Sequence, residues 1–261
     1  MRNKGCLIVF EGIEGSGKST ASRKLEKYLA TKDYRVLCTK EPTTSKIGTL
    51  IENILTGSIQ VAEEAIPLLF AADRADHTRR IIVPAINKGT IVISDRYTHS
   101  SLAYQKSGMS KAFKQDWLQV INKYALTPDL VIFLDISPEE GLNRIGKWKR
   151  IHDDKFFEDL ETQKRIRDAY HELFNLTKQQ KQTGLFGKDL FSTSLSKVNP
   201  SDETEGMRVI TIDASLGQDE IQNIINEEVQ RFLKTKGIEK QLPQKDSSFS
   251  PSLVDSFNHQ N

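Results

Sequence analysis

The segment at residues 10–20 constrains this chain more than any other, because it reads FEGIEGSGKST and contains the pattern G-x-x-x-x-G-K-[ST]. Its fixed positions are Gly12, Gly17, Lys18 and Ser19. An apolar run precedes it and a helical pattern follows it, which is the order of strand, glycine loop and helix that a phosphate-binding loop requires. An ordinary glycine-rich turn is the competing interpretation, but the flanking elements favour phosphate binding.

The residue types in this loop suit a polyphosphate. Glycines permit the tight turn and direct successive backbone N–H groups inward, and the helix that begins near Lys18 adds its positive N-terminal end. Lys18 can reach the β- and γ-phosphates, and the Ser19 hydroxyl can bind Mg²⁺. We therefore predict a nucleoside triphosphate site formed by Gly12, Ile13, Glu14, Gly15, Ser16, Gly17, Lys18, Ser19 and Thr20.

Five short runs rich in Val, Ile and Leu recur along the chain, at 6–10, 35–39, 90–94, 130–134 and 208–212. Helical patterns lie between them, and unbroken apolar strands that alternate with helices indicate a parallel sheet buried on both faces. We predict an α/β fold of the P-loop type. It has three layers (α/β/α), a five-stranded parallel sheet covered by helices on both faces, and a short basic lid. Ligands of such sheets gather at the carboxyl ends of the strands.

The predicted organisation is one domain at residues 1–233, followed by a tail at 234–261 whose composition indicates disorder. Residues 62–87 predict a long helix, in which Pro67 is tolerable only in the first turn. Residues 177–206 are rich in polar residues and predict an inserted, mobile loop.

Phe70 and Arg74 are four residues apart in that long helix and therefore share a face. A phenylalanine ring that stacks on a base, beside a guanidinium that donates to its carbonyl, would suit a nucleobase. The alternative is that Asp73 and Arg74 form a solvated ion pair on the helix surface.

Polar residues follow the third apolar run. Asp95 at the tip of a strand can hold Mg²⁺ or its waters, and Arg96 can grip a phosphate with two parallel hydrogen bonds. Ser101, Tyr104 and Gln105 lie on neighbouring turns of the next helix. They are either polar contacts for a base edge or an exposed helix face.

A basic run follows the fourth apolar run. Arg144, Lys147 and Arg150 share one helix face, which is usually a solvated surface. Beside a phosphate-binding loop, we predict instead a lid at about 144–155 that brings positive charge to the transferred phosphoryl group. For Asp135 and Ser137, which precede this helix, the simplest interpretation is helix capping.

Composition excludes several classes of protein. The net charge of +2 gives no electrostatic basis for binding nucleic acid or membranes. No apolar stretch approaches the roughly 20 residues that span a bilayer, and no signal-peptide pattern opens the chain. Cys6 and Cys38 lie in apolar runs, so we expect buried, reduced thiols and a cytoplasmic location.

Together these motifs resemble those of the thymidylate kinase family, a member of the nucleoside monophosphate kinase group of P-loop proteins. The resemblance covers roughly residues 5–175 and 207–233. The segments that carry it are the loop at 10–20, Glu41–Pro42, Phe70–Arg74, Asp95–Tyr97, Ser101–Gln105 and Phe133–Asp135.

The resemblance implies transfer of the γ-phosphoryl group of ATP to dTMP with Mg²⁺, in dTTP biosynthesis. It implies catalytic roles for Lys18, Asp95, Arg96 and Arg150, and a metal site at Ser19 and Asp95. Arg144 would join the loop residues in binding ATP. The implied dTMP-binding residues are Glu14, Glu41, Phe70, Arg74, Arg96, Ser101, Tyr104 and Gln105.

Within that set, Glu14 takes the position that contacts the 3′-hydroxyl, and Tyr104 would crowd the 2′ position of the sugar. The phosphate loop contains no arginine, so the lid must supply one, with Arg150 foremost and Lys149 nearby. The family's usual Thr-Arg-Glu-Pro-Gly-Gly is here TKEPTT at 39–44, and lysine does not replace arginine at a forked contact.

Alternatives remain at this point: a kinase for another (deoxy)nucleoside monophosphate, a P-loop protein that binds nucleotide to control an interaction, or a weakly active paralogue. The expected partners are small-molecule substrates only, without nucleic acid or membrane. The family tends to form homodimers, and long helices at 62–87 and 97–123 would offer a face for one.

Overall fold

A computed structural model describes residues 5–108, 115–148, 159–175, 185–186 and 206–240. Most of the predicted lid, most of the predicted insertion and the tail beyond residue 240 therefore lie outside the described residues. No helix in the described ranges combines the length and apolar character that a membrane-spanning segment needs.

A single sheet forms the centre of the molecule, with strand order β2-β3-β1-β4-β6-β5. The first five of these strands are parallel, as predicted. The last strand in this order, β5, is short and pairs antiparallel with β6. It lies in the segment that was expected to be an insertion. The strands are β1 (Leu7–Glu11), β2 (Val36–Lys40), β3 (Ile91–Asp95), β4 (Leu130–Asp135), β5 (Leu185–Phe186) and β6 (Arg208–Asp213).

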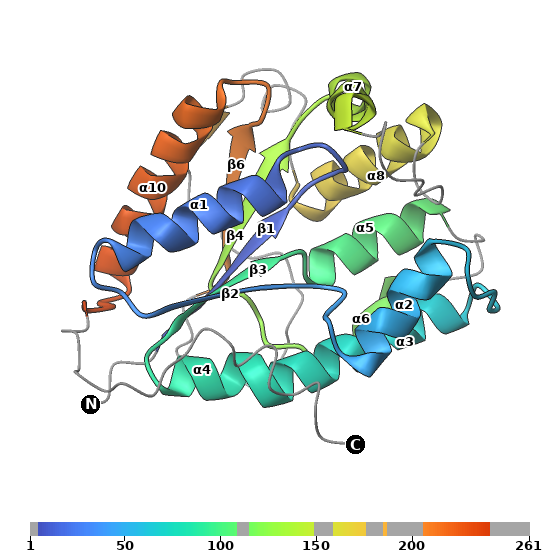
Figure 1. The fold of residues 1–261 in the computed structure, drawn as a ribbon, viewed down its shortest axis with the longest axis horizontal. Coiled ribbons are helices and arrows are strands. Elements are labelled where there is room, and N and C mark those ends of the chain that lie inside the picture. The colour runs from blue at the N-terminus through green and yellow to red at the C-terminus, as the bar shows by residue number, and fades with distance from the viewer. Residues whose placement is uncertain (1–4, 109–114, 149–158, 176–184, 187–205, 241–261) are drawn as a thin grey trace.

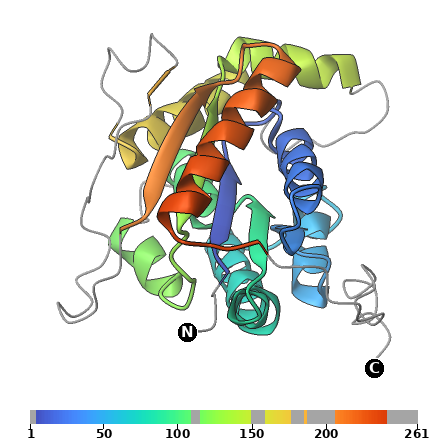
Figure 2. The ribbon, with the colours of Figure 1, turned by 90° about the vertical axis from the view of Figure 1, so that its left-hand side faces the viewer.

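Helices cover both faces of the sheet. Helices α1 and α10 pack side by side on one face, whereas α4, α5 and α8 lie on the other (Figures 1 and 2). The helices are α1 (Lys18–Ala30), α2 (Lys46–Leu55), α3 (Ala65–His77), α4 (Val83–Asn87), α5 (Thr98–Gly108), α6 (Gln115–Ile121), α7 (Pro138–Trp148), α8 (Leu160–Leu173) and α10 (Gln218–Thr235). The three-layer α/β/α architecture is confirmed.

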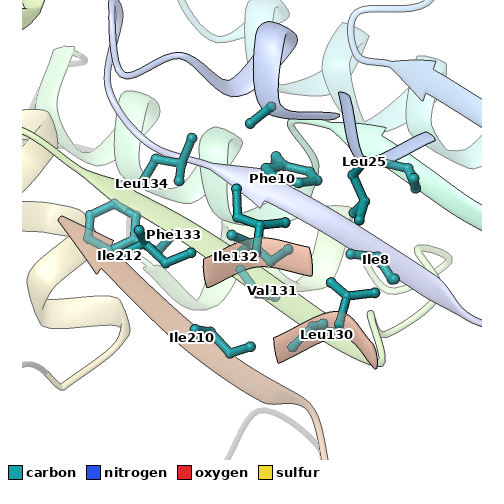
Figure 3. Close-up of a cluster of buried hydrophobic side chains, with 14 of the residues drawn as sticks. Ile8, Phe10, Leu25, Leu130, Val131, Ile132, Phe133, Leu134, Ile210 and Ile212 are labelled. Atoms are coloured by element: carbon teal, nitrogen blue, oxygen red, sulfur yellow. The ribbon is translucent and has the colours of Figure 1, made fainter. Parts of the chain in front are cut away.

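The alternation of side chains along β1 explains why both faces need a cover. Ile8 and Phe10 join the core cluster that contains Leu25 of α1, whereas Leu7 and Val9 pack in a separate cluster with Ile82 (Figure 3). Successive residues of a strand point to opposite faces, and burying each large apolar side chain contributes roughly 1.5–3 kcal/mol. A strand that is apolar at every position is therefore stable only between two layers.

The long helix predicted at 62–87 begins later and contains an irregular turn. It consists of α3, a π-helical segment at Thr78–Ile82, and α4. Pro67 lies in the first turn of α3, as required. The backbone N–H of Val83 donates to the carbonyl of Thr78, which is the five-residue spacing of a π turn. Pro84 supplies the physical reason, because it has no N–H to donate within the helix and its ring crowds the preceding turn.

Candidate functional site

The phosphate-binding loop connects β1 to α1 at the carboxyl edge of the sheet (Figure 1). Gly12, Gly15 and Gly17 have φ angles of 147°, 74° and 93°, conformations that residues with a Cβ rarely adopt. A Cβ on Gly15 would lie 2.2 Å from the carbonyl oxygen of Gly141 in α7. The glycines therefore serve both the turn itself and its close packing against the following elements.

Lys18 lies within the curve of this loop, with 5% of its surface exposed. Its Nζ donates to the carbonyl oxygen of Ile13 at 2.7 Å and lies 3.3 Å from Oγ of Ser16. Burial, with a further contribution from the cation of Arg96, lowers the pKa of Lys18 to about 8. An anion placed in the loop would reverse this shift, because it favours the charged ammonium.

Ser19 and Asp95 meet at the mouth of the loop, where the serine hydroxyl donates to Oδ2 of the carboxylate. The other carboxylate oxygen, Oδ1, is buried and has no hydrogen-bond partner among the described residues. A buried carboxylate oxygen without a donor is costly, and a hard divalent cation would satisfy it. The described ranges contain no cluster of three or more His, Cys, Asp or Glu residues able to hold a metal.

Arg96 follows β3 and lies beside this loop. Its backbone adopts φ 70°, a left-handed conformation that costs a residue with a side chain of order 1 kcal/mol. Its Nη2 pairs with the Glu14 carboxylate, and Nη1 lies 3.3 Å from Oγ of Ser100. The guanidinium lies 4.9 Å from the centroid of the Tyr104 ring, whose hydroxyl donates to Glu14 at 3.4 Å. The strained backbone thus brings the guanidinium to the donor loop.

Arg74 is buried, with an exposed fraction of 2%, so the alternative of a solvated surface ion pair is wrong. Its Nε donates to Glu41 at 2.8 Å, and Nη2 donates to Ser101 at 2.8 Å and to the carbonyl oxygen of Tyr97 at 3.2 Å. Its Nη1 donates to Asn122, which follows α6. Four contacts from three segments of the chain therefore fix the orientation of this guanidinium. Phe70, one turn earlier, is half-buried.

Glu41 connects Arg74 to strand β2. Its second oxygen lies 3.0 Å from Nδ1 of His77, and the other ring nitrogen lies 2.9 Å from Oγ1 of Thr39. Glu41 and His77 are both buried. A buried carboxylate is stable only when it is paired and hydrogen-bonded, and this one has two partners from the same helix.

Asp73 holds the loop that follows β2. Its carboxylate accepts hydrogen bonds from the backbone N–H of Thr43 at 2.8 Å, from the Thr43 hydroxyl at 2.5 Å and from the Ser45 hydroxyl at 3.0 Å. Ser45 in turn caps α2 through the N–H of Gly48. Asp73 and Arg74 therefore fix the segment 41–45 from two sides, where the sequence departs from the family pattern.

Comparison with known proteins decides the family. The family model "Thymidylate kinase" matches residues 10–184. This chain belongs to the thymidylate kinase family. It is 43% identical over 178 residues to "Probable thymidylate kinase" of Thermococcus gammatolerans, which covers 65% of this chain and 83% of that protein.

Two further relatives agree. The "Probable thymidylate kinase" of Pyrococcus horikoshii is 43% identical over 176 residues, covering 65% of this chain and 83% of the relative. The "Thymidylate kinase" of Clostridium novyi is 38% identical over 177 residues, covering 66% of this chain and 85% of the relative. The resemblance read from the motifs of the sequence is thus confirmed.

Several of the predicted site residues are not brought together in the described part of the structure. Arg150 and Lys149 lie outside the described residues, as do the side chains of Gln105 and Lys147. Arg144 is described, and it pairs with Glu140 on the surface of α7 at 2.6 Å.

Asp135 and Ser137, both predicted to cap the following helix, have different contacts in the structure. Ser137 caps α7 through the N–H of Glu140 at 3.2 Å, as the capping interpretation predicts. For Asp135 that interpretation is wrong, because its carboxylate binds Arg167 at 2.7 Å and His171 at 2.9 Å. Both partners lie on α8, about thirty residues away, so no local pattern reveals them.

Glu11 is a further residue that sequence reasoning missed. It is fully buried and accepts hydrogen bonds from the N–H groups of Tyr97 and Ser100 at 3.0 and 3.2 Å. The hydroxyls of Ser100 and Tyr170 donate to its other oxygen at 2.5 and 2.9 Å. Burial raises the pKa of Glu11, and these hydrogen bonds oppose the rise. The sequence signal for this role was the position of Glu11 at the end of an apolar run, directly before the glycine loop. A carboxylate at the end of a buried strand needs hydrogen-bond partners.

Proposed function

We propose that this protein transfers the γ-phosphoryl group of ATP to dTMP, giving dTDP and ADP, as a step in dTTP biosynthesis. Family membership and the names of the relatives support this proposal. The observation that carries it is the contact between Arg96 and Glu14, since it puts a cation able to hold an acceptor phosphate at the edge of the donor loop. A protein that only binds a nucleotide has no need of that second cation.

On the donor side, the loop at residues 12–20, through backbone amides other than that of Glu14, and the ammonium of Lys18 would hold the phosphates of ATP. Ser19 and Asp95 would hold Mg²⁺, because the serine oxygen is adjacent to Oδ2 of Asp95 and the other carboxylate oxygen, Oδ1, has no hydrogen-bond partner among the described residues. When bound, the metal ion supplies positive charge that neutralises the phosphate oxygens. We assign further charge to Arg144 and, outside the described residues, to Arg150.

On the acceptor side, Arg96 would bind the phosphate of dTMP and Glu14 the 3′-hydroxyl. Phe70 would stack on thymine, and Tyr104 would exclude a 2′-hydroxyl. Arg74 would donate to the carbonyl of the base: its four contacts occupy four of the five N–H groups of a guanidinium, and one remains. Glu41 orients Arg74, and we assign Ser101 and Gln105 to the edge of the base.

Such a division of tasks matches the chemistry. Phosphoryl transfer through a loose transition state requires alignment and neutralisation of charge rather than covalent participation by the protein. We further propose a homodimer formed through the α3–α4 and α5–α6 regions, supported by the exposed apolar side chains of Leu68, Val120 and Tyr124. A cytoplasmic location is proposed on the basis of the two unbridged cysteines.

A substrate panel tests the proposal. The protein is incubated with Mg·ATP and, separately, dTMP, dUMP, dCMP, AMP or GMP, and ADP is measured. We expect ADP release with dTMP far above that with the other acceptors. Efficient release with another monophosphate would identify a different nucleoside monophosphate kinase, and no release with any acceptor would indicate a nucleotide-binding module.

Variants locate the reaction at this site. Arg96→Met should lower kcat/KM for dTMP about a thousandfold, because it removes a charged phosphate contact, while ATP still binds. Arg80→Met is the matched control, since Arg80 is an exposed arginine that pairs only with Asp76 in the described contacts. Equal activity of both variants would show that the acceptor phosphate binds elsewhere.

A further inference from the structure

Helix α8 presents a polar face to the carboxyl ends of two central strands. Tyr170 donates to Glu11 at the end of β1, and Arg167 and His171 bind Asp135 at the end of β4. Residues spaced by three and four along a helix share a face, so these contacts fix the second half of α8 against the sheet.

The first turn of α8 continues this face at Gln163, whose side chain is completely buried. Its Oε1 accepts a hydrogen bond from the backbone N–H of Glu14 at 3.3 Å, across 149 residues of sequence. The turn itself is well capped: the Asp159 side chain accepts from the N–H of Thr162 at 2.8 Å, and the N–H of Gln163 donates to the carbonyl of Asp159 at 3.1 Å. Gln163 is therefore held in place by its own helix.

The contact acts on Glu14, the loop residue that faces the acceptor side. A backbone amide has one hydrogen, so an N–H directed at Gln163 is not directed at a donor phosphate. The side chain of the same residue reaches Arg96 and Tyr104. Within the loop, Glu14 thus differs from Lys18 and Ser19: α8 holds its backbone, and its carboxylate lies beside the cation that we assign to the acceptor phosphate.

We propose that Gln163 is a positioning residue for acceptor binding, which fixes the peptide of Glu14 and thereby aims its carboxylate at Arg96 and at the sugar of the acceptor nucleotide. This inference rests on the proposed function and extends it to a residue that follows the predicted lid in the sequence. Neither the motifs of the loop nor the acceptor-side motifs include Gln163. It acts through Glu14 and touches no reacting atom.

Two substitutions separate the hydrogen bond from the packing. Gln163→Met keeps the length and volume of the side chain but removes the acceptor oxygen. Gln163→Glu keeps an acceptor oxygen, because complete burial favours the neutral carboxylic acid, which has the shape of the amide. Loss of a hydrogen bond to a buried amide corresponds to roughly a tenfold change in an equilibrium. We expect Gln163→Met to raise KM for dTMP about tenfold, with KM for ATP and kcat within about threefold, and Gln163→Glu to restore KM for dTMP to within about threefold.

A second buried glutamine provides the matched control. Gln222 donates to Asn226 at 3.0 Å and belongs to α10, the helix that covers the other face of the sheet (Figure 2). Gln222→Met should leave both KM values unchanged. Equal rises in both KM values for Gln163→Met, or no rescue by Gln163→Glu, would show a general loosening of the fold and overturn the inference.

Amide hydrogen exchange provides a readout that does not depend on turnover. In the wild-type protein the Glu14 amide should exchange slowly, and in Gln163→Met it should exchange about tenfold faster relative to the amides of β1. If the wild-type amide is unprotected, or the variant does not change it, the inference fails. If the wild-type protein does not phosphorylate dTMP yet the exchange behaves as expected, the proposed function fails instead and Gln163 still positions Glu14.

Discussion

The two sides of the site that we assign to the phosphoryl donor and to the acceptor are built in opposite ways. The donor side is one continuous segment, residues 12–19, in which backbone groups and Lys18 surround the position of a phosphate. The acceptor side gathers side chains from distant segments around Arg74, which contacts Glu41, Ser101, Asn122 and the Tyr97 carbonyl.

The two sides also differ in how deeply some of their polar side chains are buried. Ser19 and Thr20 are exposed at the mouth of the loop, whereas Arg74 and Glu41 are almost completely buried. Ile13, Ser16 and Lys18 of the donor loop are buried too. The described hydrogen bonds of the Lys18 side chain stay within the loop, whereas those of Arg74 join distant segments of the fold. Substitutions on the donor side should therefore change activity alone, and substitutions on the acceptor side should change stability as well.

The largest effect is expected at Lys18. Lys18→Met keeps the apolar stem but removes the cation from the phosphates, so kcat/KM for ATP should fall about a thousandfold, or ~4 kcal/mol. Burial disfavours the charged form of Lys18, so the ammonium does not stabilise the folded state. Its loss should therefore not lower the melting temperature. Lys24→Met is the control, since Lys24 is an exposed lysine on the same helix that pairs with Asp219. A Lys18 variant that unfolds at a lower temperature would erase the distinction between the two sides.

A smaller effect, this time on folding, is expected at Glu41. Glu41→Ala leaves the buried Arg74 without its counter-charge and should lower the free energy of unfolding by about 3 kcal/mol, measured by urea denaturation. Glu52→Ala removes an exposed partner of Lys40 from the same region and should cost less than about 1 kcal/mol. Similar losses for both variants would show that the buried network does not support the fold.

The smallest effect concerns pH. Burial lowers the pKa of Lys18 to about 8, so its ammonium is fully present below that pH and is lost above it. We expect kcat/KM for ATP to be constant from about pH 7 to 7.5 and to fall roughly tenfold by pH 9. At saturating ATP, kcat/KM for dTMP should stay flat, because bound phosphate keeps Lys18 charged and the Arg96 guanidinium does not titrate in this range. A matching decline for both substrates would contradict the assignment.

The contrast between a continuous segment and contacts among distant segments also explains what could be predicted from the sequence. The loop at 10–20 and the five parallel strands follow from local patterns, since each strand lies within one residue of its predicted run. The role of Asp135 could not be predicted, because its partners Arg167 and His171 are distant in sequence. The π-helical turn before Pro84 was also missed, although the proline itself was visible.

By itself, the sequence determined the order of apolar and glycine-rich segments along the chain, the phosphate-binding loop and the family, because glycine conformation and strand burial are properties of neighbouring residues. Only the tertiary structure decided that Arg74 is buried against Glu41 and Asn122, that Glu11 accepts hydrogen bonds from α5 and α8, and that Gln163 holds Glu14. These contacts join side chains across tens of residues. Their partners are chosen by packing between layers, for which a single sequence contains no local signal.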